Sequence, residues 1–236
     1  MNGAMHGVPL IERVIESVER IGLEGPDGAP RLVKPVPLPE QAIRELRMPG
    51  GRLLPPSLRR WLAFDAWWLS RIGWFADPRA PVLRGAALSA TAGFMYGFSS
   101  GEGGWTEGFG AFEALLPGMC FPLVGGSDSR RLLYAGEPDS LGEYPVLVLD
   151  ADDEPFVAVM YPGFDVYLAH EAGVLDFEFD TYSDLIDHPE YGGRMREHAE
   201  RTGLGAEGAD IQDVRTAVRA AAGRITDAPD SPEAED

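Results

Sequence analysis

The chain has 236 residues, of which 44% are hydrophobic and 10% aromatic, so it can fill a hydrophobic core and is not a disordered protein. Its formal net charge of −18 is unevenly divided: residues 1–100 carry 12 basic and 9 acidic side chains, whereas residues 101–236 carry 8 and 29. No dense basic cluster occurs, so we expect no direct binding to nucleic acid.

Neither a cationic segment followed by an apolar one nor a run of about 18 apolar residues is present, so we expect neither export nor a membrane span. The single cysteine, Cys120, lies in an apolar run and cannot form an intramolecular disulfide. This usage favours a reducing, cytoplasmic compartment, with Cys120 packed in the core.

Apolar residues recur at helical spacing from Leu10 to Ile21, with charged residues between them, and predict a surface helix that ends near Gly22. Five prolines within residues 24–39 then predict an extended connector. Residues 40–47 predict one short helix.

Leu54-Pro55-Pro56-Ser57 predicts the start of a helix that runs towards Leu69, because proline is tolerated in the first turn of a helix. Four tryptophans between residues 61 and 74 are more typical of a core than of a ligand site. Residues 85–110 are rich in glycine, serine and alanine and predict a loop, and residues 109–116 predict a helix.

From Phe121 onward, short apolar segments alternate with turn residues, a pattern that predicts an antiparallel β-meander. The five expected strands are residues 121–124, 131–135, 144–149, 156–161 and 166–169. Three further helices are expected, at about 181–187, 190–202 and 210–223. The predicted fold class is therefore α+β, with a meander of about five strands packed against N- and C-terminal helices.

These elements predict four parts of the chain. Residues 1–50 form an N-terminal helical extension with a proline-rich connector. Residues 51–190 form the main α+β domain, with an insertion at about 63–119. Residues 191–225 form a C-terminal helical extension, and residues 226–236 form an acidic tail whose charge and prolines predict disorder.

Two stretches carry a family resemblance. One is LPPSLRRWLAF from Leu54, a proline-capped helix; the other runs from CFPLVGGSDSRRLLYA at Cys120 through YPVLVLDADDEPFVAVMYPGFDVYLA to FDTYSDLI, which ends at Ile186. Together they resemble the SUKH superfamily, which contains bacterial toxin-immunity proteins and a yeast regulator of cell-wall synthesis, over roughly half of the chain. The resemblance implies a SUKH-like α+β domain without a catalytic centre, which neutralises a cognate protein toxin by covering it. Many of those toxins look like nucleases, whose phosphate-binding sites are basic.

Residues 137–190 contain 15 carboxylates and no lysine or arginine. Within this stretch, Asp176, Glu178 and Asp180 alternate with apolar residues, so an extended segment would place three carboxylates on one side. One interpretation is an ordinary solvated face. Because a like-charged surface repels itself, a docking face for a basic partner is an equally favoured interpretation. The candidate partner-binding residues are Asp150, Asp152, Asp153, Glu154, Asp165, Asp176, Glu178 and Asp180.

The main alternative is a metal-dependent transferase or hydrolase, because an apolar strand that ends in Asp-x-Asp can present oxygen ligands to a divalent cation. Its ligands would be Asp150, Asp152 and Glu154. The same residues fit a polar turn between two strands, without the glycine that an EF-hand loop requires. We therefore expect no enzyme, no catalytic residue, no metal and no cofactor, and we keep a non-catalytic regulatory or scaffold module as a further alternative.

Overall fold

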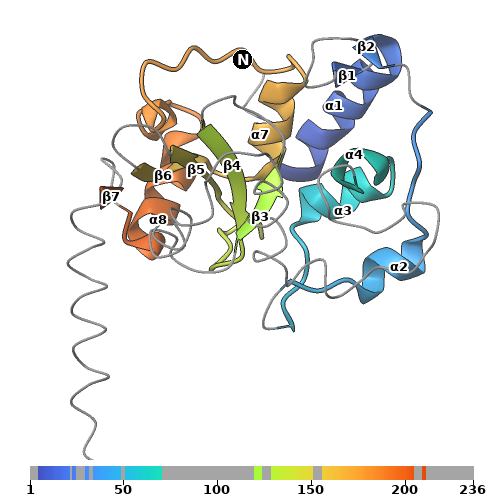
Figure 1. Cartoon of the computed structure of the whole chain (residues 1–236), viewed down its shortest axis with the longest axis horizontal. Helices are drawn as coiled ribbons and strands as arrows, with labels where there is room; N and C mark the ends of the chain where they lie inside the picture. Colours follow the sequence, from blue (N-terminus) through green and yellow to red (C-terminus); the bar gives the residue numbers. More distant parts are fainter. Residues whose placement is uncertain are drawn as a thin grey trace, which may run out of the picture.

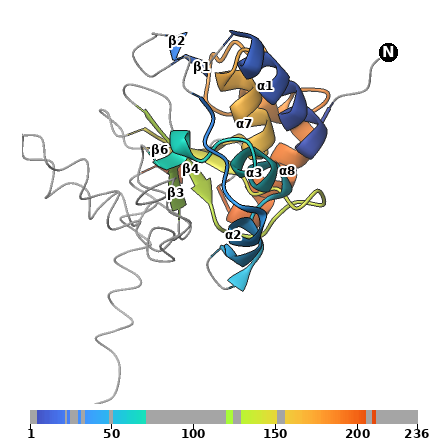
Figure 2. The ribbon, with the colours of Figure 1, turned by 90° about the vertical axis from the view of Figure 1, so that its right-hand side faces the viewer.

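The computed structural model describes residues 5–21, 23–24, 30–31, 34–48, 51–70, 120–123, 129–150, 156–204 and 209–210. This part is an α+β structure, in which helices lie together on one side of an antiparallel sheet (Figures 1 and 2). The predicted loop at 85–110, the helix at 109–116 and the tail at 226–236 lie outside the described residues.

Four consecutive strands form the antiparallel meander: β3 (Cys120–Leu123), β4 (Ser129–Tyr134), β5 (Val146–Asp150) and β6 (Phe156–Tyr161). They match the first four predicted strands to within a few residues. A two-residue strand, β7 (Ala209–Asp210), pairs with the start of β6 and completes the order β3-β4-β5-β6-β7. A separate two-stranded ribbon joins β1 (Leu23–Glu24) to β2 (Pro30–Arg31).

The predicted fifth strand at 166–169 is wrong, because these residues belong to helix α7 (Phe164–Glu171). Every residue from Phe164 to Ala169 is buried, so the helix shows no polar face in its sequence. A short, uniformly apolar run does not distinguish a buried strand from a buried helix. The predicted helix at 210–223 lies almost wholly outside the described residues, and Asp210 itself belongs to β7.

Helix α1 (Gly7–Ile21) confirms the predicted amphipathic helix, and its apolar stripe packs against α3 and α7. Figure 2 shows α1, α3, α7 and α8 gathered on the same side of the sheet. The short helix expected after the connector is also present, as α2 (Glu40–Glu45).

The helix predicted from Pro56 towards Leu69 is broken into α3 (Pro56–Leu62) and α4 (Trp67–Ser70). The buried carboxylate of Asp65 causes the break, since it accepts hydrogen bonds from the amides of Trp67 (3.2 Å) and Trp68 (3.0 Å). It also accepts one from the amide of Val36 (2.9 Å). An aspartate that bonds neighbouring amides starts a new helix instead of continuing the old one.

After α7 the chain runs in an extended, irregular path to the 3₁₀ turn η2 (Asp184–Ile186) and then to α8 (Gly192–Thr202). The predicted helix at 190–202 is confirmed, whereas the one at 181–187 is only a single 3₁₀ turn. Gly203, with φ of 70°, ends α8 in the left-handed conformation that glycine adopts without strain.

One hydrophobic core joins the sheet to α1, α3, α7 and α8, so the predicted N- and C-terminal extensions contribute to the same core as residues 51–190. Trp61 and Tyr167 are completely buried in it. Cys120 is buried as expected, and burial raises the pKa of its thiol. Among the described residues, no helix has the length and apolar character needed to cross a bilayer.

Candidate partner-binding face

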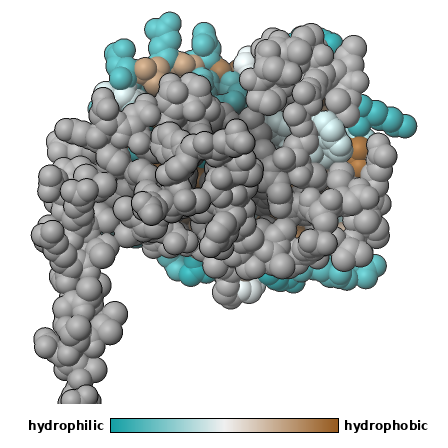
Figure 3. All heavy atoms as spheres, viewed as in Figure 1, coloured by the Kyte–Doolittle hydropathy of each residue, from teal (hydrophilic) through white to brown (hydrophobic). Residues whose placement is uncertain are grey.

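The segment between α7 and η2 displays carboxylates at every second residue. Asp176, Glu178 and Asp180 are exposed, whereas Phe177 and Phe179 between them are half-buried. The predicted alternation is therefore present, although this segment is not a strand of the sheet. In the space-filling view, hydrophilic projections alternate with more hydrophobic residues along the upper edge, where Figure 1 places this segment (Figure 3).

Aromatic rings support the segment from below. Phe177 packs edge-on against Tyr191, with ring centroids 5.7 Å apart, and Phe179 packs in the same way against Tyr161 at 5.7 Å. His170 of α7 contacts both phenylalanines and accepts or donates a hydrogen bond of 2.9 Å at Nδ1 with the Tyr161 hydroxyl. Burial lowers the pKa of His170. The carboxylates thus stand on a packed aromatic layer and not on a free loop.

Tyr182 connects this segment to the end of strand β5. Its hydroxyl donates a hydrogen bond of 2.8 Å to Oδ2 of Asp150, and its ring stacks on Phe156 with centroids 6.2 Å apart. Asp150 and Phe156 are the last residue of β5 and the first of β6, so both ends of the β5–β6 connection meet Tyr182. The connection itself, with Asp152, Asp153 and Glu154, lies outside the described residues.

Asp184 fixes the far end of the segment. Its carboxylate accepts hydrogen bonds from the amides of Asp180 (2.6 Å) and Thr181 (3.0 Å), and from the Thr181 hydroxyl. These hydrogen bonds lower the pKa of Asp184, and the one from the Thr181 side chain has the largest effect. The acidic edge, defined as Asp150 with Asp176, Glu178 and Asp180, is therefore anchored at Tyr182 and at Asp184.

Asp165 is the exception among the candidate residues, because it is completely buried and contributes nothing to an exposed face. Its carboxylate pairs with Arg194 of α8, with contacts of 2.8 and 3.2 Å, and accepts a hydrogen bond of 2.7 Å from the amide of Gly7. The prediction that Asp165 belongs to the docking face is wrong. It sits in the first turn of α7, where the helix dipole and the Arg194 charge both stabilise an anion.

Two further carboxylates of the acidic stretch are internal. Asp139 receives a hydrogen bond of 2.5 Å from Nε of Arg194 and lies 3.6 Å from His198. Burial raises the pKa of Asp139, but His198 and Arg194 outweigh it and lower the pKa to about 2. Glu143 accepts hydrogen bonds from the amide (2.9 Å) and hydroxyl of Ser57, while burial and the nearby charge of Asp165 raise its pKa to about 8.

No family model matches the chain, and no curated protein matches it. A solved structure does. It is the crystal structure of an uncharacterized protein from Salmonella enterica subsp. enterica serovar typhimurium str. 14028s, with 16% sequence identity and a TM-score of 0.49. The match covers 89% of this chain and 98% of that chain.

The structure thus links Asp150 through Tyr182 to the segment that bears Asp176, Glu178 and Asp180, and it places Asp165 in the interior. The sequence did not indicate Tyr182 as this link. No local signal identifies Tyr182, because its partners come from strands 26 or more positions earlier in the chain. The structure describes only one of the three candidate metal ligands. Asp150 accepts a hydrogen bond from Tyr182, while Asp152 and Glu154 lie outside the described residues. Within the described part of the chain, no group of three or more His, Cys, Asp or Glu is arranged to hold a metal ion.

Proposed function

We propose that this protein is a SUKH-type immunity protein, which binds a basic, nuclease-type toxin through the acidic edge and neutralises it by occlusion. The observation that carries the proposal is the contact of Tyr182 with both Asp150 and Phe156. This contact places the end of β5 next to the segment that bears Asp176, Glu178 and Asp180. Two acidic elements far apart in the sequence are therefore linked through one tyrosine, which supports their use as one docking face.

Electrostatic complementarity explains why such an edge suits a basic partner. Carboxylates held on a fixed support keep their charge in one place, so a basic surface is attracted and oriented before contact. The binding of a protein partner also costs less free energy when its docking surface is already ordered. The α+β architecture with helices on one face of an antiparallel sheet is the one that the SUKH resemblance implies, and it supports the proposal.

Charge reversal tests the docking face. We expect the triple variant Asp176→Lys, Glu178→Lys and Asp180→Lys to lower the association rate with the toxin by about 10-fold or more at low salt. The matched control makes the same charge change on exposed residues of α1, α2 and α8, through Glu19→Lys, Glu45→Lys and Glu200→Lys. Surface plasmon resonance measures the association rates of the wild type and both variants. These rates should converge at increasing salt, because salt screens exposed charges.

The toxin candidates are the products of the genes that lie beside this one. Each is co-expressed with the intact protein, and growth is compared with that of cells that express the toxin candidate alone. Rescue by the wild type and the control variant, but weaker rescue by the acidic-edge variant, supports the proposal. Equal rescue by both variants would show that the interface lies elsewhere on the protein. If no candidate is bound while metal-dependent turnover disappears on Asp152→Ala, the enzyme alternative replaces this proposal; stable binding of a nontoxic partner would instead favour a scaffold.

A further inference from the structure

A polar cleft separates helix α1 from the turn that follows α7, on residues that the acidic edge does not use. It has a volume of about 480 Å³, within the range of small-molecule sites. The residues that line it are Arg13, Glu16, Ser17, Arg20, Gly173 and Val174. Among these residues, two arginines outnumber the one glutamate, so the lining is net positive on a chain of net charge −18.

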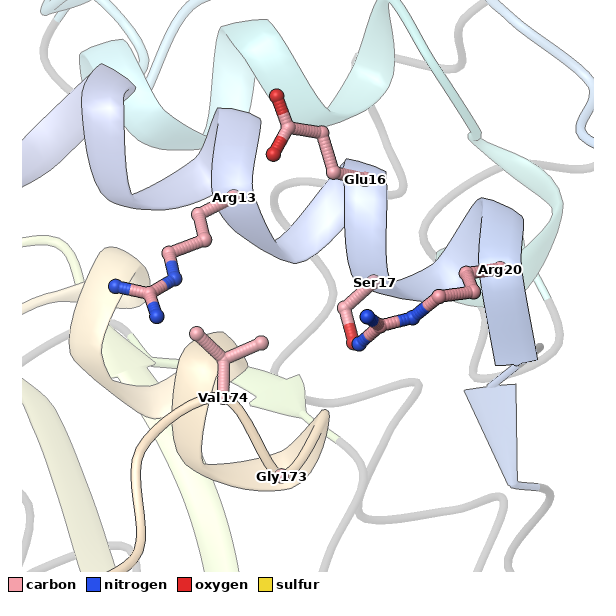
Figure 4. A pocket seen from close by; sticks show the side chains of 6 residues that line it. All are labelled: Arg13, Glu16, Ser17, Arg20, Gly173 and Val174. Atoms are coloured by element: carbon pink, nitrogen blue, oxygen red, sulfur yellow. The ribbon is translucent and has the colours of Figure 1, made fainter.

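The arginines occupy one face of the helix. Arg13, Ser17 and Arg20 are spaced by four and three residues, so they align along α1, with the two arginines roughly 10 Å apart along its axis. Figure 4 shows the side chains of all three turned towards the strip that carries Gly173 and Val174, with the two guanidinium groups on either side of Val174. The carboxylate of Glu16 points away from that strip, towards the other side of α1.

Neither guanidinium is neutralised within the described part of the chain, where no ion pair joins Arg13 or Arg20 to a carboxylate. By contrast, Glu12 on the same helix is paired with Arg60 through two hydrogen bonds. Arg13 and Arg20 are also exposed, so both remain accessible to a ligand. The cleft thus offers two unneutralised guanidinium groups with the Ser17 hydroxyl between them.

We propose that this cleft binds a small phosphate ligand that carries at least two anionic phosphate groups, one for each arginine. The planar guanidinium donates paired hydrogen bonds to phosphate oxygens, and each phosphate group supplies enough acceptors for one arginine and the Ser17 hydroxyl together. A carboxylate has only two oxygens and satisfies fewer of these donors. Val174 supplies an apolar wall against which a base or sugar ring packs.

Isothermal titration calorimetry of the full chain tests the site, with inorganic pyrophosphate and ATP as the phosphate probes and glutarate and adenosine as controls. We expect pyrophosphate, ATP or both to bind with a Kd below about 1 mM, and the double variant Arg13→Gln and Arg20→Gln to weaken binding about 10-fold or more. The control Arg44→Gln and Arg47→Gln removes the same charge from two exposed arginines, one in α2 and one just after it, and should bind like the wild type. Circular dichroism checks that both double variants remain folded.

Several results would overturn the proposal. They are the absence of binding by both phosphate probes at 10-fold above that concentration, equal affinity for glutarate or adenosine, and equal weakening by the two double variants. A second variant, Ser17→Gln, narrows the middle of the cleft without changing its charge. It should weaken pyrophosphate binding less than the arginine double variant does, and the opposite order would also contradict the proposed contacts.

Discussion

Arg194 and Asp165 form a two-pronged ion pair inside the protein, with Nη1 2.8 Å from Oδ2 and Nη2 3.2 Å from Oδ1. The same guanidinium donates through Nε to Asp139, and the same carboxylate accepts the amide of Gly7. One arginine of α8 therefore joins the starts of α7 and α1 to the turn that precedes β5. Part of the negative charge of residues 137–190, that of Asp139 and Asp165, is therefore neutralised inside the fold.

Replacing Arg194 with methionine should strongly destabilise the protein, because it leaves two buried carboxylates without their partner. We expect the free energy of unfolding to fall by about 3–5 kcal/mol. Urea unfolding followed by tryptophan fluorescence measures it. The control is Arg60→Met, which breaks the partly exposed pair with Glu12 and should cost less than about 1 kcal/mol. Similar losses in the two variants would show that the Arg194 network does not stabilise the interior.

Glu143 predicts a decline of stability towards alkaline pH. Its pKa is raised by burial, and by Asp165, from 4.5 to about 8, so the folded state holds a proton that the unfolded state has lost between these values. The stabilisation is complete below pH 4.5 and is lost as pH rises through 8. Glu143→Gln mimics the protonated form, so at pH 9 it should be more stable than the wild type by at least about 1 kcal/mol. Urea unfolding at pH 6 and pH 9 measures the difference, and parallel declines in both proteins would contradict this account.

The break between α3 and α4 depends on Asp65. Asp65→Ala removes the acceptor for the amides of Trp67, Trp68 and Val36, and should lower the free energy of unfolding by about 1–3 kcal/mol. Asp65→Asn keeps one side-chain oxygen as an acceptor and should cost less. Chemical unfolding of both variants distinguishes them, and equal losses would contradict the capping role.

Much of the fold could be predicted from residues that are neighbours in the chain. Turn residues between apolar segments located β3 to β6, and the spacing of Leu10 and Ile11 with Val14 located α1. Predictions failed where tertiary partners decide the outcome. The run at 166–169 is helical because its surroundings bury every side, and Asp65 ends α3 through contacts that include the distant amide of Val36.

The candidate site likewise combines features that local sequence predicts with features that depend on long-range contacts. The alternation of Asp176, Glu178 and Asp180 is local and was predictable, but the burial of Asp165 depends on Arg194, 29 positions away. Nothing in the composition of an acidic stretch separates exposed carboxylates from those that pair inside the fold. The link from Tyr182 to Asp150 spans 32 positions and was invisible for the same reason.

Cys120 offers a direct probe of the core. Its thiol is buried at the start of β3 and its pKa is raised by burial, so the reactive thiolate is both scarce and shielded. Alkylation by iodoacetamide should be at least about 100-fold slower in buffer than in 8 M urea, because opening of the core must come first. Mass spectrometry measures the rate, and comparable rates in the two solvents would contradict a closed core around β3.

The hydrogen bond from Gly7 to Asp165 spans 158 positions, and the arginine that neutralises that carboxylate comes later still. During translation, the first helix therefore leaves the ribosome long before either group that completes its contact exists. Until α8 has emerged, Asp165 has no arginine partner in the interior. Because burying an unpaired carboxylate is costly, we expect Asp165 to be buried only after residue 194 has left the ribosome.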